Sequence, residues 1–165
     1  MGPNGLMPLS IPVIHTHGDK PLLKDVRIDY DSNWNKIHWK SLVASYASSP
    51  FFEYLADELA PFYEKKFSFL IDLNHQLINF SLQQLGKTIA VKRSENFTEI
   101  VEMQDPRYFI HPKKNQAELD PGFQPEAYHQ VFADRLGFRS NLSILDLLFN
   151  VGPAALSYLL RSLKT

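Results

Sequence analysis

The chain has 165 residues, of which 44% are hydrophobic and 13% aromatic, and this composition is typical of one folded domain with a real core. The formal net charge of −1 argues against the basic surface that nucleic-acid-binding and membrane-surface domains present. The absence of cysteine excludes disulfides, thiolate metal sites and a cysteine nucleophile. No apolar run reaches the ~18 residues of a membrane span, and MGPNGLMPLS lacks the pattern of a signal peptide. We therefore expect a cytoplasmic protein.

The N-terminal segment predicts a small antiparallel sheet. Residues 9–17 alternate onto one face, residues 25–30 alternate more clearly, and Gly18-Asp19-Lys20-Pro21 between them has the residues of a turn. Pro12 cannot donate a ladder hydrogen bond, which predicts an edge strand or a bulge. His15 and His17 leave the same face of this strand and could bind Zn²⁺ if Asp29 or His38 came close, but no second motif has metal-ligand spacing. We therefore predict no metal site.

The first predicted helix begins after a cap at Asp31 or Ser32 and runs to about Ala47. At 100° per residue it has two adjacent stripes. The first is an ordinary core stripe, made of Trp39, Leu42, Val43 and Tyr46. The second combines an aromatic, a titratable and two small side chains, which are Trp34, His38, Ser41 and Ser45. The second stripe is either another packing face or part of a binding site, because sugar and nucleotide sites use such side chains.

Several further helices follow. A helix at residues 51–60 begins with Ser49 as its cap and Pro50 at its first position. A long helix ends near Gly86, and residues 87–97 suggest a short strand. Residues 105–125 hold four prolines and form a long excursion with little periodicity. The chain closes with three helices at residues 125–138, 143–150 and 152–164, the last two separated by Gly152-Pro153. Together these elements predict an α+β fold, a helix-rich single domain with the small antiparallel sheet near its N-terminus.

Asp146 is the acid with the most apolar neighbourhood, inside Ile144-Leu145-Asp146-Leu147-Leu148-Phe149. Such surroundings could raise the pKa of its carboxyl and make it a general acid or base. Ser143 and Asp146 also have the spacing of a capping box, so capping the helix is the alternative role. Asn141 and Asn150 flank this segment and could either cap helices or contact a substrate. No hydrolase elbow, phosphate-binding glycine loop, zinc-protease motif or dinucleotide fingerprint occurs in the chain.

Several motifs in the same order resemble the WbqC-like protein family: LSIPVIH, KDVRIDYDSNWNKIHWKSLVASYASSPFFEYL, YHQVFADRLGF and NLSILDLLFNVGPAAL. The resemblance covers about residues 6–160. The family pattern places a Trp four residues before a His, then a Tyr, an S-P-aromatic-F segment and a Phe-Asn-x-Gly-Pro run. Trp34, His38 and Tyr46 occupy the first three of these positions. Family members usually begin with a further segment, so the resemblance implies that residues 1–165 form a single WbqC-like domain that is incomplete at its N-terminus.

The resemblance implies a role in the synthesis of O antigen and other surface polysaccharides. It favours a group-transfer enzyme that acts on a nucleotide-activated, amino-bearing sugar, with a non-catalytic binding or assembly module as the alternative. We predict His38 and Asp146 as catalytic residues, and the substrate-binding residues as Trp34, Tyr46, Asn141 and Asn150. The expected partner is a small-molecule activated sugar, with no nucleic acid and no membrane span. A homo-oligomer is an open alternative, and the sequence names no cofactor.

Overall fold

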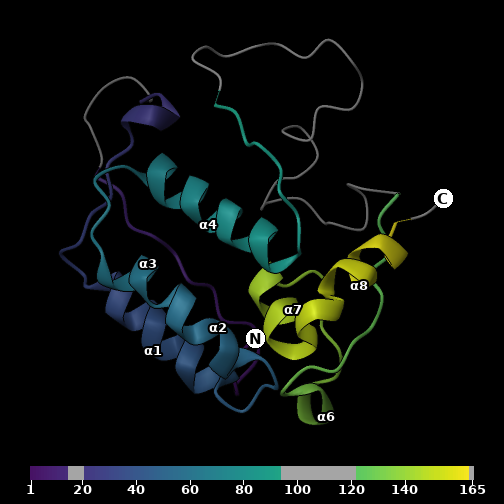
Figure 1. The fold of residues 1–165 in the computed structure, drawn as a ribbon. Coiled ribbons are helices and arrows are strands. Elements are labelled where there is room, and N and C mark those ends of the chain that lie inside the picture. Colours follow the sequence, from purple (N-terminus) through teal and green to yellow (C-terminus); the bar gives the residue numbers. More distant parts are fainter. Residues whose placement is uncertain (15–20, 94–121, 164–165) are drawn as a thin grey trace.

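The computed structural model describes residues 1–14, 21–93 and 122–163. Helices make up its regular structure (Figure 1). In chain order the elements are η1 (Leu23–Asp25), α1 (Trp34–Tyr46), α2 (Phe52–Leu59), α3 (Pro61–Glu64), α4 (Leu70–Gln84), α6 (Ala133–Leu136), α7 (Ile144–Val151), η3 (Gly152–Ala154) and α8 (Ala155–Arg161).

The predicted antiparallel sheet is wrong, although the fold is helix-rich as expected. Within the described ranges the chain forms isolated antiparallel bridges and no strand, as at Val13–Ile28 and Arg27–Phe69. Residues 26–29 divide their hydrogen bonds between residues 12–14 on one side and residues 68–70 on the other. Pro12 has no N–H to extend the first pairing, and η1 ends and α4 begins next to the second. Each pairing therefore stays one residue long. The strand expected near residue 87 is also absent from residues 87–93.

The first helix agrees with its prediction at one end only. It ends at Tyr46, one residue before the predicted limit, but its first cap is different. Asn33 precedes the helix in the left-handed conformation, at φ 52°, and makes no side-chain capping bond. The carboxylate of Asp29 accepts instead from the backbone N–H of Asp31 at 2.9 Å. The turn before α1 is therefore held from outside the helix.

The predicted long helix is divided into two. α3 ends at Glu64, and α4 begins at Leu70 after a segment in which Phe69 pairs with Arg27. This segment buries Phe67, whose backbone N–H donates to the hydroxyl oxygen of Tyr30 at 2.8 Å instead of to a helix carbonyl. Gly86 lies just beyond α4 at φ 66°, which confirms the predicted end of the helix.

The core consists of two clusters of buried side chains. The larger cluster joins α1, α2, α4, α7 and α8, and its fully buried members are Leu59, Leu148, Phe149 and Ala155. The smaller cluster lies where the bridges meet α1 and α4, and consists of Ile28, Trp34, Phe67 and Leu73. In Figure 1, α1, α2 and α3 lie on one side of the molecule and α7 and α8 on the other, with α4 running beside them. Helix α7 supplies three buried side chains of the larger cluster, Leu147, Leu148 and Phe149.

Residues Ile144–Arg161 are long and apolar enough to pass a composition test for a membrane span. The stretch is interrupted by η3, and it buries Asp146 and Asn150 together with four apolar residues, Leu147, Leu148, Phe149 and Ala155. These features are typical of the core helices of a soluble protein.

Of the first closing helix, predicted at residues 125–138, only α6 forms.

Candidate functional site

Helix α7 begins with a side-chain cap, because the hydroxyl of Ser143 accepts from the backbone N–H of Leu145 at 3.3 Å. The carboxylate of Asp146 takes no part in this cap. Its side chain turns into the protein, where the residue is 1% exposed. The capping role predicted for Asp146 is therefore wrong, while that of Ser143 is confirmed.

Three side chains donate hydrogen bonds to the Asp146 carboxylate. The hydroxyl of Tyr46 donates to Oδ1 at 2.7 Å, and the hydroxyl of Tyr128 donates to Oδ2 at 2.7 Å. The amide Nε2 of Gln130 also donates to Oδ2, at 3.0 Å. These residues come from α1, from the segment before α6 and from α7. We call Tyr46, Tyr128, Gln130 and Asp146 the carboxylate cluster.

The tyrosines of the cluster are held as neutral donors. Burial, together with the negative charge and hydrogen bonds of Asp146, raises the pKa of both tyrosine hydroxyls above the usual value. The Met1 amino group donates to the Tyr46 hydroxyl at 2.6 Å and lies 3.9 Å from Oδ1 of Asp146. Burial lowers the pKa of this amino group, and the nearby Asp146 opposes that shift.

Gln130 fixes the segment that carries Tyr128. Its side chain is fully buried, and its Nε2 also donates to the backbone carbonyl of Arg139 at 2.8 Å. Its Oε1 accepts from the backbone N–H of Arg139 at 2.9 Å. An amide that pairs with both backbone groups of one residue replaces a missing piece of secondary structure. The loop on either side of α6 is thereby closed onto α7.

A cavity of about 220 Å³ lies between this loop and helices α7 and α8. Tyr128 lines it, and its ring packs edge-on against Phe138 at 5.4 Å and Tyr158 at 6.0 Å between ring centroids. Asn141 and Ser143 add polar groups to the wall. An aromatic wall with a few polar groups is typical of small-molecule sites. We call it the Tyr128 cavity.

The structure brings three predicted site residues together. Asp146 and Tyr46 bond directly, and Asn150 joins them because its Nδ2 donates to the Asp146 backbone carbonyl at 2.7 Å. The Oδ1 of Asn150 is buried without a hydrogen-bond partner in the described part of the chain. Asn141 lies apart from these three, at φ 61° in the wall of the Tyr128 cavity.

His38 and Trp34 lie in a different environment. His38 is 6% exposed, and its Nε2 is 3.1 Å from the backbone carbonyl of Ser10, to which a ring N–H would donate. Its ring meets the Trp34 ring edge-on at 5.0 Å and the Tyr63 ring at 6.4 Å. Burial lowers the pKa of His38, partly offset by the bond to Ser10, and burial raises the pKa of Tyr63 to about 12.

The second stripe of α1 is thus a packing surface as well. Trp34 is 3% exposed, and its indole Nε1 is buried without a partner among the described residues. Ser45 is also buried. Asp146 does not orient the imidazole of His38, because the hydrogen bonds of the two residues go to separate partners. The predicted catalytic pair is therefore not a contacting pair.

Sequence reasoning missed Tyr128 and Gln130. Both lie in YHQVFADRLGF, one of the motifs that carry the family resemblance. The apolar spacing of that motif predicted a helix, which would have sent the two side chains in directions set by a 100° turn. In the structure α6 begins only at Ala133, so residues 128 and 130 reach the carboxylate from a segment without regular secondary structure.

Within residues 1–14, 21–93 and 122–163, no three histidine, cysteine or acidic side chains gather where they could hold a metal ion. His15 and His17 lie outside the described residues. The Asp72 carboxylate pairs with Arg93 at 2.9 Å on the surface.

Two of the spaced motifs meet at the start of α2. The backbone N–H of Phe51 donates to the Phe149 carbonyl at 3.0 Å, which joins the S-P-F-F segment to the F-N-V-G-P run. Gly152 then has φ 52°, and a β-carbon on it would lie 2.5 Å from Cδ1 of Phe51. A glycine is required here by both backbone angle and space.

Comparison with known proteins gives two matches. The model of the WbqC-like protein family matches residues 1–158. The uncharacterized protein Rv1507c of Mycobacterium tuberculosis (strain ATCC 25618 / H37Rv) is 27% identical over 177 residues, an alignment that covers 94% of this chain and 76% of that protein. No solved structure matches the chain significantly.

Proposed function

This chain belongs to the WbqC-like protein family, and we propose that it is a cytoplasmic group-transfer enzyme that acts on an activated amino sugar during the synthesis of surface polysaccharides such as O antigen. The sugar moiety alone would bind in the Tyr128 cavity, because the cavity volume of about 220 Å³ lies below the value of about 300 Å³ at which sites for whole small molecules begin. The observation that carries this proposal is the carboxylate cluster, in which a buried acid is held by Tyr128, a residue that also lines the cavity.

The cluster supplies a route for one proton. In the proposed step the amine nitrogen of the sugar attacks the acyl or aminoacyl carbon of a second substrate, and the leaving group departs with the bonding electron pair. The proton lost by the amine passes to the Tyr128 oxygen as the phenol proton passes to Asp146. Asp146 is too deeply buried to meet the sugar itself, so Tyr128 makes the contact.

The remaining predicted residues receive roles from their positions. Asn141 would bind a polar group of the sugar, because it lines the cavity. Tyr46 and Asn150 would position Asp146, since they bond its carboxylate and its backbone. His38 and Trp34 remain predicted site residues, but their aromatic packing favours them less than the carboxylate cluster.

A non-catalytic binding or assembly module within a polysaccharide-synthesis complex is the second candidate. It is favoured by one observation, that the Asp146 carboxylate already accepts three hydrogen bonds inside the protein. A hub of that kind needs no reaction to explain it.

A ligand screen separates the two candidates. Nucleotide-activated sugars with and without a free amino group are added singly to the protein, and the melting temperature is recorded. A ligand at about one hundred times its dissociation constant stabilises the fold by about 2.7 kcal/mol. We expect a rise with an amino sugar, a smaller rise with Asn141→Ala, and a mass gain on the sugar when an acyl or aminoacyl donor is added.

Tyr128→Phe supplies the matched control for chemistry. It keeps the aromatic wall and removes the hydroxyl, so sugar binding should persist while the mass gain is lost. Binding without any mass gain in the unchanged protein would favour the non-catalytic module. The absence of a thermal shift with every activated sugar would contradict the proposal.

A further inference from the structure

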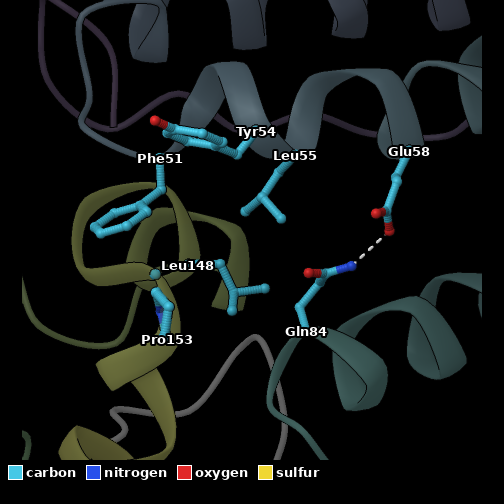
Figure 2. A pocket seen from close by; sticks show the side chains of 8 residues that line it. Phe51, Tyr54, Leu55, Glu58, Gln84, Leu148 and Pro153 are labelled. Carbon is cyan, nitrogen blue, oxygen red and sulfur yellow. Dashed lines mark hydrogen bonds between the residues drawn. The ribbon is translucent and has the colours of Figure 1, made fainter.

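A second cavity, of about 350 Å³, lies between α2, α4 and α7. Figure 2 shows Phe51 and Pro153 at one end, Glu58 and Gln84 at the other, and Leu55 and Leu148 between them. Its volume falls in the range of small-molecule sites, which begins at about 300 Å³. The Tyr128 cavity is lined by a separate set of residues, so the two are distinct.

The floor of this cavity is built rigidly. The Phe51 ring packs where a β-carbon of residue 152 would lie, and the Phe51 N–H bonds to the Phe149 carbonyl. The contact fixes η3 against the first turn of α2. Leu148 is 1% exposed and Leu55 is 8% exposed, so the floor belongs to the core rather than to a mobile surface.

The opposite end presents hydrogen-bond acceptors. The Nε2 of Gln84 donates to Oε2 of Glu58 at 2.7 Å, as Figure 2 shows. That bond occupies one N–H of Gln84 and leaves its Oε1 and the second carboxylate oxygen of Glu58 as acceptors. A ligand that fills this end can therefore donate to these two oxygens, while the second N–H of Gln84 remains a donor.

The charge at this end is uncompensated. None of the eight lining residues is basic, and in the described part of the chain Glu58 forms no ion pair. Helix α2 itself carries Glu53, Asp57 and Glu58 and no basic residue. A carboxylate with no basic residue on its own helix or in the cavity lining favours a cation over a neutral donor and disfavours an anion.

We propose that this cavity binds a small primary amine, whose apolar body lies over Leu55, Leu148 and the ring of Phe51 and whose ammonium group donates to Glu58 and Gln84. The proposal is independent of the proposed function, because it uses no residue of the carboxylate cluster or the Tyr128 cavity.

Three probes of one shape test the charge preference: 2-phenylethylamine, 2-phenylethanol and phenylacetate. Each is titrated into the full chain, and binding is followed by the chemical shifts of the lining residues. Exposed charge pairs are worth little, so we expect the amine to bind about threefold more tightly than the alcohol. Phenylacetate should bind most weakly of the three.

Two variants locate the effect. Glu58→Gln keeps a side chain that can bond Gln84 but removes the charge, so the amine should fall to the affinity of the alcohol. Asp57→Asn removes an exposed charge one residue away that does not line the cavity, and should leave the threefold preference intact. Equal binding of amine and alcohol would overturn the proposal, as would shifts that avoid the lining residues or an equal loss with both variants.

Discussion

His38 and Asp146 are both buried polar residues of the core, with exposures of 6% and 1%, but their surroundings differ. His38 has one hydrogen-bond partner, the backbone carbonyl of Ser10, and is otherwise enclosed by aromatic rings. Asp146 has three side-chain donors drawn from distant parts of the chain. Of the two, Asp146 is the one connected through a hydroxyl to a cavity.

The difference shows that burial of a titratable group does not by itself indicate a site. The surroundings of His38 keep its ring neutral, because desolvation disfavours the imidazolium. The surroundings of Asp146 supply three side-chain hydrogen bonds to its carboxylate, one of them from Tyr128, which also lines a cavity. The first arrangement suits packing, and the second suits proton transfer.

Removal of the Asp146 carboxylate should have the largest effect on stability. Asp146→Ala would leave the hydroxyls of Tyr46 and Tyr128 and the Gln130 amide without their acceptor inside the core. We expect the free energy of unfolding to fall by about 3 kcal/mol or more, since each buried unpaired group costs about 1–3 kcal/mol. Urea unfolding measures the change. Asp72→Ala removes an exposed ion pair with Arg93 and should lower the unfolding free energy by less than about 1 kcal/mol. Similar losses in both variants would mean that the carboxylate cluster does not stabilise the core.

A second test concerns how firmly α7 is joined to α2. Gly152→Ala would place a methyl group inside the Phe51 ring at a positive φ, and we expect a loss of about 2–4 kcal/mol from overpacking and left-handed strain together. Gly86→Ala is the matched control, because it has φ 66° but no atom within 4 Å of the added carbon. It should cost about 1–2 kcal/mol. Equal losses measured by urea unfolding would mean that the contact with Phe51 relaxes freely.

Removal of a tyrosine hydroxyl should lower the unfolding free energy by less than removal of the Asp146 carboxylate. Tyr128→Phe and Tyr46→Phe each remove one hydrogen bond to Asp146 without changing ring packing, and each should lower the unfolding free energy by about 1–2 kcal/mol. The two changes should not add in the double variant, because they share one carboxylate. Calorimetric melting of the singles and the double gives the coupling, and strict additivity would argue against a shared cluster.

Much of the fold follows from local pattern. Helical spacing predicted where α1, α2 and α7 lie and where α4 ends but not where it begins, and Ser143 predicted a cap. The small sheet did not follow, because alternation in residues 9–17 and 25–30 says nothing of a third segment, residues 68–70, that bonds the same backbone. Competition between two segments for the same backbone hydrogen bonds depends on the tertiary structure, and the alternation of apolar and polar residues cannot show it.

The site was predictable in part for the same reason. Asp146 and Asn150 were named from the apolar segment at residues 143–150, and Tyr46 from the family resemblance, and the structure joins the three. Tyr128 and Gln130 reach Asp146 from a segment whose apolar spacing is that of a helix it does not form. The side chains of His38 and Trp34 were placed on a second stripe of α1, but spacing could not tell whether protein or ligand covers that stripe.

The smallest effect concerns the protonation of His38. Burial lowers its pKa in the folded state, so as pH falls the unfolded chain, near pKa 6.5, binds the proton first. The folded state therefore loses stability as pH falls from about 6.5 toward the lowered pKa, and this contribution is flat above that window.

His38→Gln can still donate to the Ser10 carbonyl but does not titrate. Urea unfolding from about pH 7.5 to 5.5 should show a shallower loss for this variant than for the unchanged protein. His129→Gln alters an exposed histidine and should keep the unchanged slope. If His38→Gln shows the same dependence of the unfolding free energy on pH as the unchanged protein, the folded core accepts the protonated imidazole. The difference between the surroundings of His38 and Asp146 then does not hold.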